Sequence, residues 1–257
     1  MKKELHDLNR LATAYFDLAK KWDGASIFLR LGVFLGSILA IFVSVDFAWL
    51  PITAFLLSIA VELVAWRADV LAGKAGELKR IYEYADGFGQ RPTARDLSNL
   101  KAAGGKAKSS DSFDFLLKGN VFASREEAGA RRLVENLMES SWWSFHLART
   151  TAIYYFGLIG ALSVVSLITL FYSVNVLTGH EELKGVAKLV TAVILLIFSL
   201  GLVRKCLGFV TFSKSAEGTD RECERALEQD NLSETTALRL LYDYQLGRAS
   251  APLIPSW

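Results

Sequence analysis

The apolar residues of the chain gather into four long blocks instead of recurring at the spacing of an amphipathic helix or strand. The blocks cover residues 27–45, 47–66, 150–176 and 186–212. Each is close to the roughly 20 residues that a helix needs to cross about 30 Å of hydrocarbon. The rest of the chain is too short to bury four such helices in a soluble core. The pattern therefore predicts an all-α integral membrane protein, with four transmembrane helices in two hairpins and cytoplasmic helical extensions.

The four blocks divide the chain into five parts. These are an amphipathic cytoplasmic helix (1–26), a first transmembrane hairpin (27–66), a cytoplasmic helical insert with a mobile basic loop (67–149), a second transmembrane hairpin (150–212), and C-terminal cytoplasmic helices with a tail (213–257). The apolar stripe of the first part suits either the membrane surface or packing against the rest of the protein. These two alternatives stay open at this point.

Local signals predict where several helices begin and end. Pro51 suits the first turn of the second span, and that helix should continue towards Tyr84 before the glycines and the proline that follow Asp86. Ser124 with Glu127 has the pattern of a capping box for the helix that enters the third span. Two further helices are expected over 213–229 and 233–246, the second with a glycine C-cap at position 247.

Lys and Arg are distributed unevenly around the four blocks. Of the 29, six lie in residues 1–30, fourteen in 67–149 and seven in 204–257, while Lys184 and Lys188 belong to the turn between the third and fourth blocks. Positive residues concentrate on the cytoplasmic side of membrane proteins. Both chain termini are therefore predicted to be cytoplasmic, and both hairpin turns to face outside.

Signatures of enzyme chemistry are absent from the sequence. The three histidines, His6, His146 and His180, are far apart in the predicted topology, and the sequence contains no metalloprotease, nucleophile-elbow or Cys-x-x-Cys motif. The two cysteines are expected to face a reducing compartment, which disfavours a structural disulfide. We expect no catalytic residue, no metal and no cofactor.

The most basic local region runs from Arg91 to Lys108. Glycines beside its lysines leave backbone N–H groups accessible to a phosphate. With three arginines of the C-terminal helices, it supplies the candidate phosphate-binding residues: Arg91, Arg95, Lys101, Lys106, Lys108, Arg221, Arg225 and Arg239. The alternative, which the weak net charge of the insert favours, is a solvated, inward-facing loop that merely obeys the positive-inside rule.

Small and acidic residues mark particular faces of the spans. Small residues at helical spacing favour close helix packing; they are Gly32, Gly36, Ala40, Gly157 and Ala161. In the second span Ser58, Glu62 and Asp69 share one face and are candidates to line or gate a pore. Glu62 is the only carboxylate inside a span, and such groups are costly enough to suggest a function. The alternative is that Glu62 lies near the inner interface and pairs with Arg30, Arg67 or a hydroxyl.

The order of parts resembles a known family of membrane effectors. The N-terminal helix carries Tyr15-Phe16-Asp17-Leu18-Ala19-Lys20, an insert separates the two hairpins, and the C-terminal helix carries Tyr242-Asp243-Tyr244-Gln245 before Pro252-Leu253-Ile254-Pro255. These parts resemble the four-transmembrane effectors of bacterial nucleotide-signalling antiphage defence, the SMODS-associating type. The resemblance covers most of the chain. The insert departs from the family's pattern, so no ligand identity is carried over.

The resemblance implies a membrane effector of abortive infection in the bacterial inner membrane. Such an effector is a homo-oligomeric ion channel or pore, gated at its cytoplasmic face by a nucleotide or nucleic-acid signal, DNA oligomers included. A partner enzyme of the nucleotidyltransferase type would make the ligand. One alternative is a non-conducting scaffold that recruits a cytoplasmic partner. The other, a small proton-coupled transporter, ranks last because no break is expected within the spans.

Overall fold

The computed structural model describes residues 2–42, 50–90, 93, 122–176, 185–187, 190, 193–194, 197 and 200–253. Its helices are α1 (Lys2–Phe42), α2 (Leu50–Phe88), α4 (Ala130–Val176), α6 (Leu202–Leu227) and α7 (Glu234–Ala249). No strand occurs in the described part of the chain, and the predicted all-α class is confirmed there.

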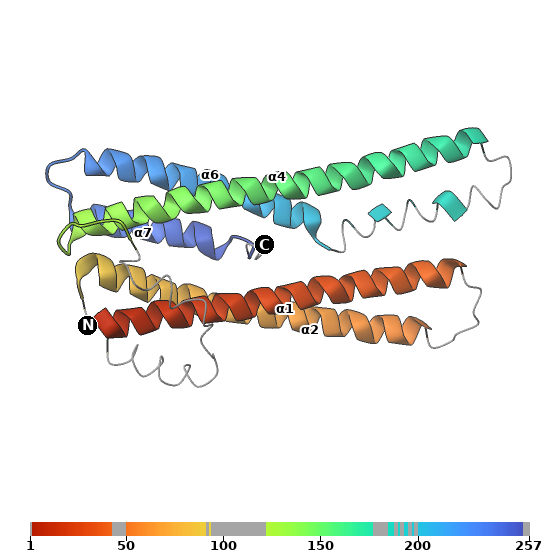
Figure 1. The fold of residues 1–257 in the computed structure, drawn as a ribbon, viewed down its shortest axis with the longest axis horizontal. Helices are drawn as coiled ribbons and strands as arrows, with labels where there is room; N and C mark the ends of the chain where they lie inside the picture. The colour runs from red at the N-terminus through yellow and green to blue at the C-terminus, as the bar shows by residue number, and fades with distance from the viewer. Residues whose placement is uncertain are drawn as a thin grey trace.

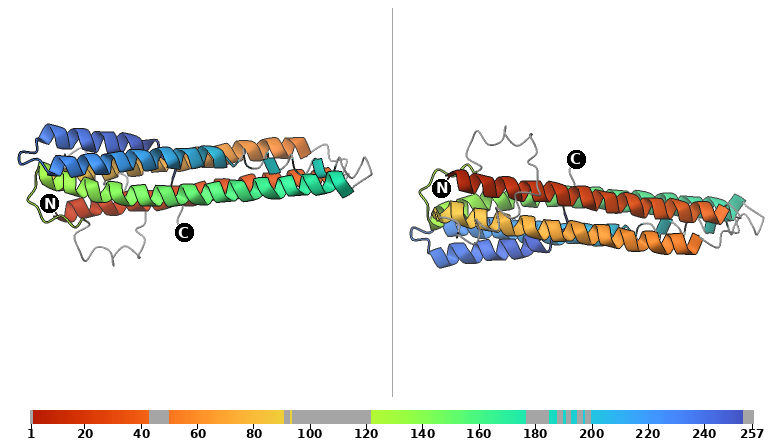
Figure 2. Two further views of the ribbon diagram at one scale, coloured as in Figure 1. Left: turned by 90° about the horizontal axis from the view of Figure 1, so that it is seen from above. Right: turned by 90° about the horizontal axis from the view of Figure 1, so that it is seen from below.

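Two antiparallel helix pairs lie side by side along the long axis of the molecule (Figure 1). Hairpin 1 consists of α1 and α2, and hairpin 2 of α4 and α6. The short α7 packs against α6 and α4 and also reaches α2. We call the end that holds α7 and the start of α1 the packed end, and the opposite end the apolar end. Figure 2 shows the same two layers from above and below.

The long helices begin and end largely where local chemistry predicts. α2 starts at Leu50 with Pro51 in its first turn and continues unbroken to Phe88. Gly89, with a φ of 65°, follows in the left-handed conformation that commonly ends helices. α1 is continuous across the expected boundary at residue 26. α4 has 47 residues and is therefore about 70 Å long, more than twice the thickness of a bilayer's hydrocarbon core.

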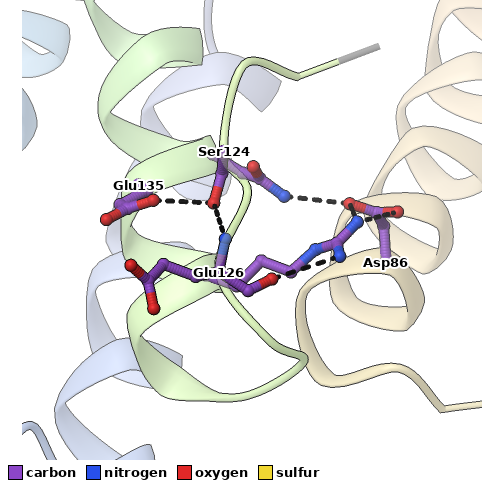
Figure 3. Close-up of polar contacts among 6 residues, drawn as sticks. Asp86, Ser124, Glu126 and Glu135 are labelled. Carbon is purple, nitrogen blue, oxygen red and sulfur yellow. Dashed lines mark hydrogen bonds and ion pairs between the residues drawn. The ribbon is translucent and has the colours of Figure 1, made fainter. Parts of the chain in front are cut away.

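The start of α4 differs from the prediction. α4 begins at Ala130, so Ser124 is not its N-cap. The Ser124 hydroxyl accepts a hydrogen bond from the Glu126 N–H at 3.3 Å and donates one to the Glu135 carboxylate at 2.6 Å (Figure 3). Because Glu135 lies more than a turn inside α4, this hydroxyl fastens the preceding segment onto the side of the helix instead of capping its end.

The C-terminal helices also correct two expectations. α6 runs from Leu202 to Leu227 as one helix, well before the predicted start at residue 213. α7 begins close to its predicted start, where the Ser233 side chain caps the helix and accepts from the Thr236 N–H at 3.1 Å. However, α7 continues to Ala249, and Gly247 is inside the helix. A Cβ at Gly247 would lie 2.6 Å from the Ser215 Oγ, so this glycine permits close packing on α6 and is not a C-cap.

A break occurs inside the fourth predicted span, where none was expected. Gly201 has a φ of 63°, which L side chains rarely adopt, and α6 starts at the next residue. The Lys205 N–H donates to the Gly201 carbonyl at 2.8 Å and closes the first turn of α6. The expectation of uninterrupted spans is therefore wrong at this position.

The amphipathic stripe of α1 is buried inside the protein. Leu8, Leu11, Ala12, Tyr15 and Ala19 pack with the α2 side chains Leu71, Ala75, Leu78, Tyr82 and Ala85 in one core cluster. Of the two alternatives for residues 1–26, packing against the rest of the protein is the one that the structure supports. A second cluster joins α4, α6 and α7, with Tyr84 and Phe88 of α2 at its edge.

The apolar end of the molecule lacks such a core. Large apolar side chains of all three long helices are exposed there, among them Phe28 at 76%, Phe55 at 64%, Ile168 at 63% and Phe171 at 75% of their full surface. Within the described residues one helix, α4 over Ala130–Tyr172, is long and apolar enough to cross a membrane. Its most apolar stretch of 18 residues has a mean hydropathy of 2.0, and only 6% of that stretch is buried. Much of the fourth span lies outside the described residues, and the four-span arrangement stays a prediction.

Close approach of α2 and the start of α4 gives the first testable prediction. A Cβ at Gly87 would lie 2.6 Å from the Leu133 Cδ1 and 3.1 Å from its Cα, whereas one at Gly73 would meet nothing within 4 Å. Gly87→Ala should lower the free energy of unfolding by about 1–3 kcal/mol through overpacking. Gly73→Ala should raise it by about 0.5–1 kcal/mol. Thermal unfolding of the two purified variants measures this, and equal stability would contradict the contact.

Candidate functional site

A pocket of about 290 Å³ lies between the two hairpins at the packed end. We call it the interhairpin pocket. Hairpin 1 contributes Lys79 from α2, and the remaining wall comes from α4, α7 and the segment before α4: Phe122, Glu139, Ser140, Trp143, Ser144, Tyr244 and Arg248. Two cations, three aromatic side chains and one carboxylate thus line the same pocket, together with the hydroxyl groups of two serines.

Tyr244 lines the interhairpin pocket and is held in place by two hydrogen bonds. It is 1% exposed, and its hydroxyl lies 2.8 Å from the Ser144 Oγ and donates to the Ser140 carbonyl at 3.3 Å. Burial raises the pKa of Tyr244, so the phenol remains neutral and keeps the proton that it donates. These bonds hold α7 against α4 and set the position of Arg248, which is one turn further along α7.

Lys79 is half-buried without a carboxylate partner among the described residues. Its ammonium donates to the Asn9 Oδ1 at 3.0 Å and lies 4.8 Å from the Tyr82 ring centre and 5.6 Å from the Phe122 ring centre. Burial lowers the pKa of Lys79, an effect that the charge of Glu83 opposes and that of Arg248 reinforces. Two rings and an amide oxygen therefore surround a positive charge that they do not neutralise.

The two carboxylates near the pocket are already engaged. Glu83, whose side chain is 6% exposed, accepts from the Arg248 guanidinium at 3.2 Å and from the Gln245 Nε2 at 3.4 Å. Glu139 accepts from the Ala123 N–H at 2.9 Å and so holds the segment that carries Phe122 over the pocket. Arg248 also stacks on Phe16 of α1, at 5.5 Å from the ring centre.

The hairpins are joined by polar contacts around this pocket. Asp86 of α2 accepts from Arg132 at 3.0 and 3.2 Å and from the Asn136 amide at 2.9 Å (Figure 3). On the side towards the apolar end, Lys205 of α6 donates to both oxygens of Asp23 in α1, at 2.9 and 3.0 Å. The Glu83–Arg248 ion pair is a third link.

Glu62, a predicted pore or gate residue, forms an ion pair. The Arg30 guanidinium donates to its Oε1 at 2.8 Å and joins α1 to α2, while 71% of the Glu62 side chain stays exposed. Pairing with Arg30 was one alternative open from the sequence, and it is confirmed. Ser58 and Asp69 are also exposed on α2. All three residues are exposed in the described chain, and their role in a pore stays a prediction.

The other predicted site residues do not reach the interhairpin pocket. Arg221, Arg225 and Arg239 are exposed on α6 and α7, and Arg221 pairs with Glu217 of its own helix. The basic loop residues Arg91, Arg95, Lys101, Lys106 and Lys108 lie outside the described residues. The pocket residues Lys79 and Arg248 were not among the predicted ones. A signal existed for Lys79, because it follows the buried Ala75 by one helical turn and so falls on the apolar face of α2.

Four of the five predicted packing residues can be described, and none of these four packs closely within the described chain. Gly32, Gly36 and Gly157 would each accept a Cβ with nothing within 4 Å, and Ala161 is exposed. Ala40 lies in α1, but its side chain is outside those described. Close packing through these residues stays a prediction, and it requires a partner other than the described part of this chain.

Comparisons of the chain with protein-family models, curated proteins and solved structures give no match in any of the three. In the described part of the chain, no group of three or more His, Cys, Asp and Glu residues could hold a metal ion. The functional assignment therefore depends on the geometry above.

The state of Lys79 gives the second testable prediction. Lys79→Met keeps the length of the side chain and removes a charge that lacks a carboxylate partner, so the variant should be more stable than the parent by about 1 kcal/mol near neutral pH. The exposed Lys74 of the same helix is the control, and Lys74→Met should change stability by less than about 0.5 kcal/mol. A clear loss of stability in Lys79→Met would identify Lys79 as a purely structural residue.

The same variant has a signature in pH. Because the pKa of Lys79 is lower in the folded than in the unfolded chain, the unfolded chain binds an extra proton between the two values. The Lys79 contribution to the free energy of unfolding therefore rises with pH across that window, which ends near the ordinary lysine value of 10.5. Thermal unfolding of parent and Lys79→Met at several alkaline pH values should show a rise that only the parent has.

Proposed function

We propose that the chain is a four-span effector of bacterial antiphage defence in the inner membrane. Its packed end lies in the cytoplasm and binds a nucleotide or nucleic-acid signal made by a partner enzyme. The spans of several copies then form or open an ion-conducting pore, which depolarises the infected cell and arrests its growth. No enzymatic step and no cofactor belong to this function.

The observation that carries this proposal is the contrast between the two ends of the helices. The same α1, α2 and α4 that bury a core at the packed end expose large apolar side chains at the other end. A soluble monomer rarely exposes such a surface, whereas lipid or further spans would cover it. The packed end carries the interhairpin pocket, so ligand and membrane sites belong to the same rigid helices.

The ion pair of Glu62 supports conduction over simple anchoring. An exposed ion pair in an apolar zone is costly against lipid and favourable against water or another polar surface. In the proposed oligomer, α2 turns Ser58, Glu62 and Asp69 towards the axis, and Arg30 fixes the Glu62 carboxylate. One copy is too small to enclose a water-filled path, so the pore needs several.

Two other functions remain as alternatives. A non-conducting scaffold would use the packed end to recruit a cytoplasmic partner. A proton-coupled transporter gains support from the break at Gly201, because interrupted spans often form transport sites. The transporter would need Glu62 as its proton carrier, yet the Glu62 carboxylate is engaged by the Arg30 guanidinium at 2.8 Å.

Ion flux tests the proposed function. The purified protein is reconstituted in potassium-loaded liposomes, and cyclic di-AMP, cyclic tri-AMP, AMP and a short single-stranded DNA are added in turn. Potassium release that at least one of these ligands starts or stops is the expected result. If the liposomes pass no ions with or without every ligand, the pore is excluded and the scaffold is favoured.

Glu62→Gln adds a prediction about selectivity. The substitution removes the negative charge beside Arg30, so the conducting protein should pass relatively more chloride and less potassium. The reversal potential in a salt gradient measures this change. Glu77→Gln, at an exposed position on the cytoplasmic part of α2, is the matched control and should leave the reversal potential unchanged. An identical reversal potential in both variants would remove Glu62 from the path.

A further inference from the structure

We propose that the interhairpin pocket binds a phosphate-bearing ligand with one planar ring, of the size of a single nucleotide unit, and that this ligand ties hairpin 1 to hairpin 2. The inference rests on the proposed function, because it names the site and the chemical class of the signal. Lys79 and Arg248 hold the phosphate, and Trp143 and Phe122 hold the ring.

The charges of the pocket call for an anion. Among the described residues, the partners of the Lys79 ammonium are all neutral. The nearby Glu83 already accepts hydrogen bonds from Arg248 and Gln245. Arg248 has five N–H donors and uses one of them on Glu83. A phosphate between Lys79 and Arg248 would receive charge-assisted hydrogen bonds from both and relieve their mutual repulsion.

The remaining wall suits a ring and a sugar. Trp143 lines the pocket with 56% of its surface exposed, and Phe122 lines it with its ring fixed against Tyr82 at 6.1 Å between centres. Aromatic faces of this kind stack on nucleobases. The Glu139 carboxylate, which would repel a second phosphate, can accept from a sugar hydroxyl or an exocyclic amine. The volume of about 290 Å³ lies at the small end of ligand pockets and fits one nucleotide unit.

A free ligand fits the position better than a lipid headgroup. Lys79 lies twelve residues beyond Arg67, the first basic residue after the second predicted span. On a continuous helix, this separation is about 18 Å along the axis. A headgroup at the inner interface would therefore not reach Lys79, whereas a soluble nucleotide or one unit of an oligonucleotide would.

The two walls of the pocket belong to different hairpins, which makes binding a link between them. Lys79 comes from α2, while Trp143 and Arg248 come from α4 and α7. The other links between the hairpins include the ion pairs Asp86–Arg132 and Asp23–Lys205 and the close contact of Gly87 with Leu133. A ligand held from both sides adds a further link and favours one relative position of the hairpins over others.

Equilibrium binding tests the site. The full chain in detergent or in nanodiscs of zwitterionic lipid is titrated with the four 5′-nucleoside monophosphates, and with adenosine and inorganic phosphate as half-ligands, following tryptophan fluorescence and thermal unfolding. At least one monophosphate should bind about ten-fold more tightly than either half-ligand. Lys79→Met and Trp143→Ala should each weaken that binding by about ten-fold, the loss expected for one ionic or stacking contact.

Matched controls and a lipid arm make the outcome decisive. Lys74→Met and Tyr242→Ala replace exposed residues that do not line the pocket, and binding should be unchanged in both. The pocket assignment is wrong if no monophosphate binds the folded parent, or if binding survives in Lys79→Met and Trp143→Ala. Stabilisation by nanodiscs of phosphatidylglycerol, lost in Lys79→Met and without any nucleotide binding, would overturn the nucleotide class in favour of a lipid.

A distance measurement tests the link between the hairpins. Spin labels on cysteines placed at the exposed Leu56 of hairpin 1 and Ile168 of hairpin 2 report the separation of the apolar ends, because native Cys206 and Cys223 are buried. The best-binding monophosphate should shift or narrow the distance distribution, and Lys79→Met should abolish the change. An unchanged distribution with bound ligand would disprove the link. Neither experiment involves conduction, so a protein that binds and does not conduct refutes the pore alone.

Discussion

The apolar surfaces of α1, α2 and α4 at one end of the molecule must be covered by something other than water, and the other features follow from this constraint. The helices that carry these surfaces are too long to lie wholly in a bilayer, since α4 alone extends about 70 Å. Covering the apolar end with lipid therefore places the packed end outside the membrane. There the same helices bury apolar stripes against each other and against α7. In the proposed membrane protein, one set of continuous helices connects the interhairpin pocket with the hydrocarbon region.

The packed end combines two core clusters with an interface that is partly apolar and partly polar. The α2 side chains Tyr84 and Phe88 pack at the edge of the second cluster, and the ion pairs of Asp86, Glu83 and Asp23 connect hairpin 1 to α4, α6 and α7. Such contacts gain modest net energy because each charge gives up hydration. Shifting these ion pairs therefore costs less free energy than opening either core. Under the proposed function, a ligand that favours one arrangement of the hairpins acts through these contacts.

Local chemistry in the sequence predicted the helical class, the start of α2 at Pro51 and its end at the glycines after Asp86, since these depend on neighbouring residues alone. The sequence-based prediction was wrong where the role of a residue depends on a contact with another part of the chain. Ser124 bonds to Glu135 instead of capping α4. Gly247 is inside α7 and makes room for Ser215 of α6. The pocket was missed because Lys79 and Arg248 belong to helices far apart in the sequence, and no spacing pattern brings them together. The Arg30–Glu62 pair was foreseen as an alternative, because one antiparallel hairpin places both residues at a similar depth.

Measuring which side of the membrane each end of the hairpins faces is the most direct test of the proposed four-span topology. Single cysteines are introduced at Asp46 and Glu181 in the two predicted outer turns, and at Glu77 and Glu222 on exposed positions of the packed end. The parent protein, whose own cysteines are buried, serves as the unlabelled control. In intact cells with a permeable outer membrane, a membrane-impermeant thiol reagent should label the first two and should reach the other two only after the inner membrane is opened. Labelling of position 77 or 222 in intact cells, or protection of position 46 or 181, would contradict a four-span protein with a cytoplasmic ligand pocket.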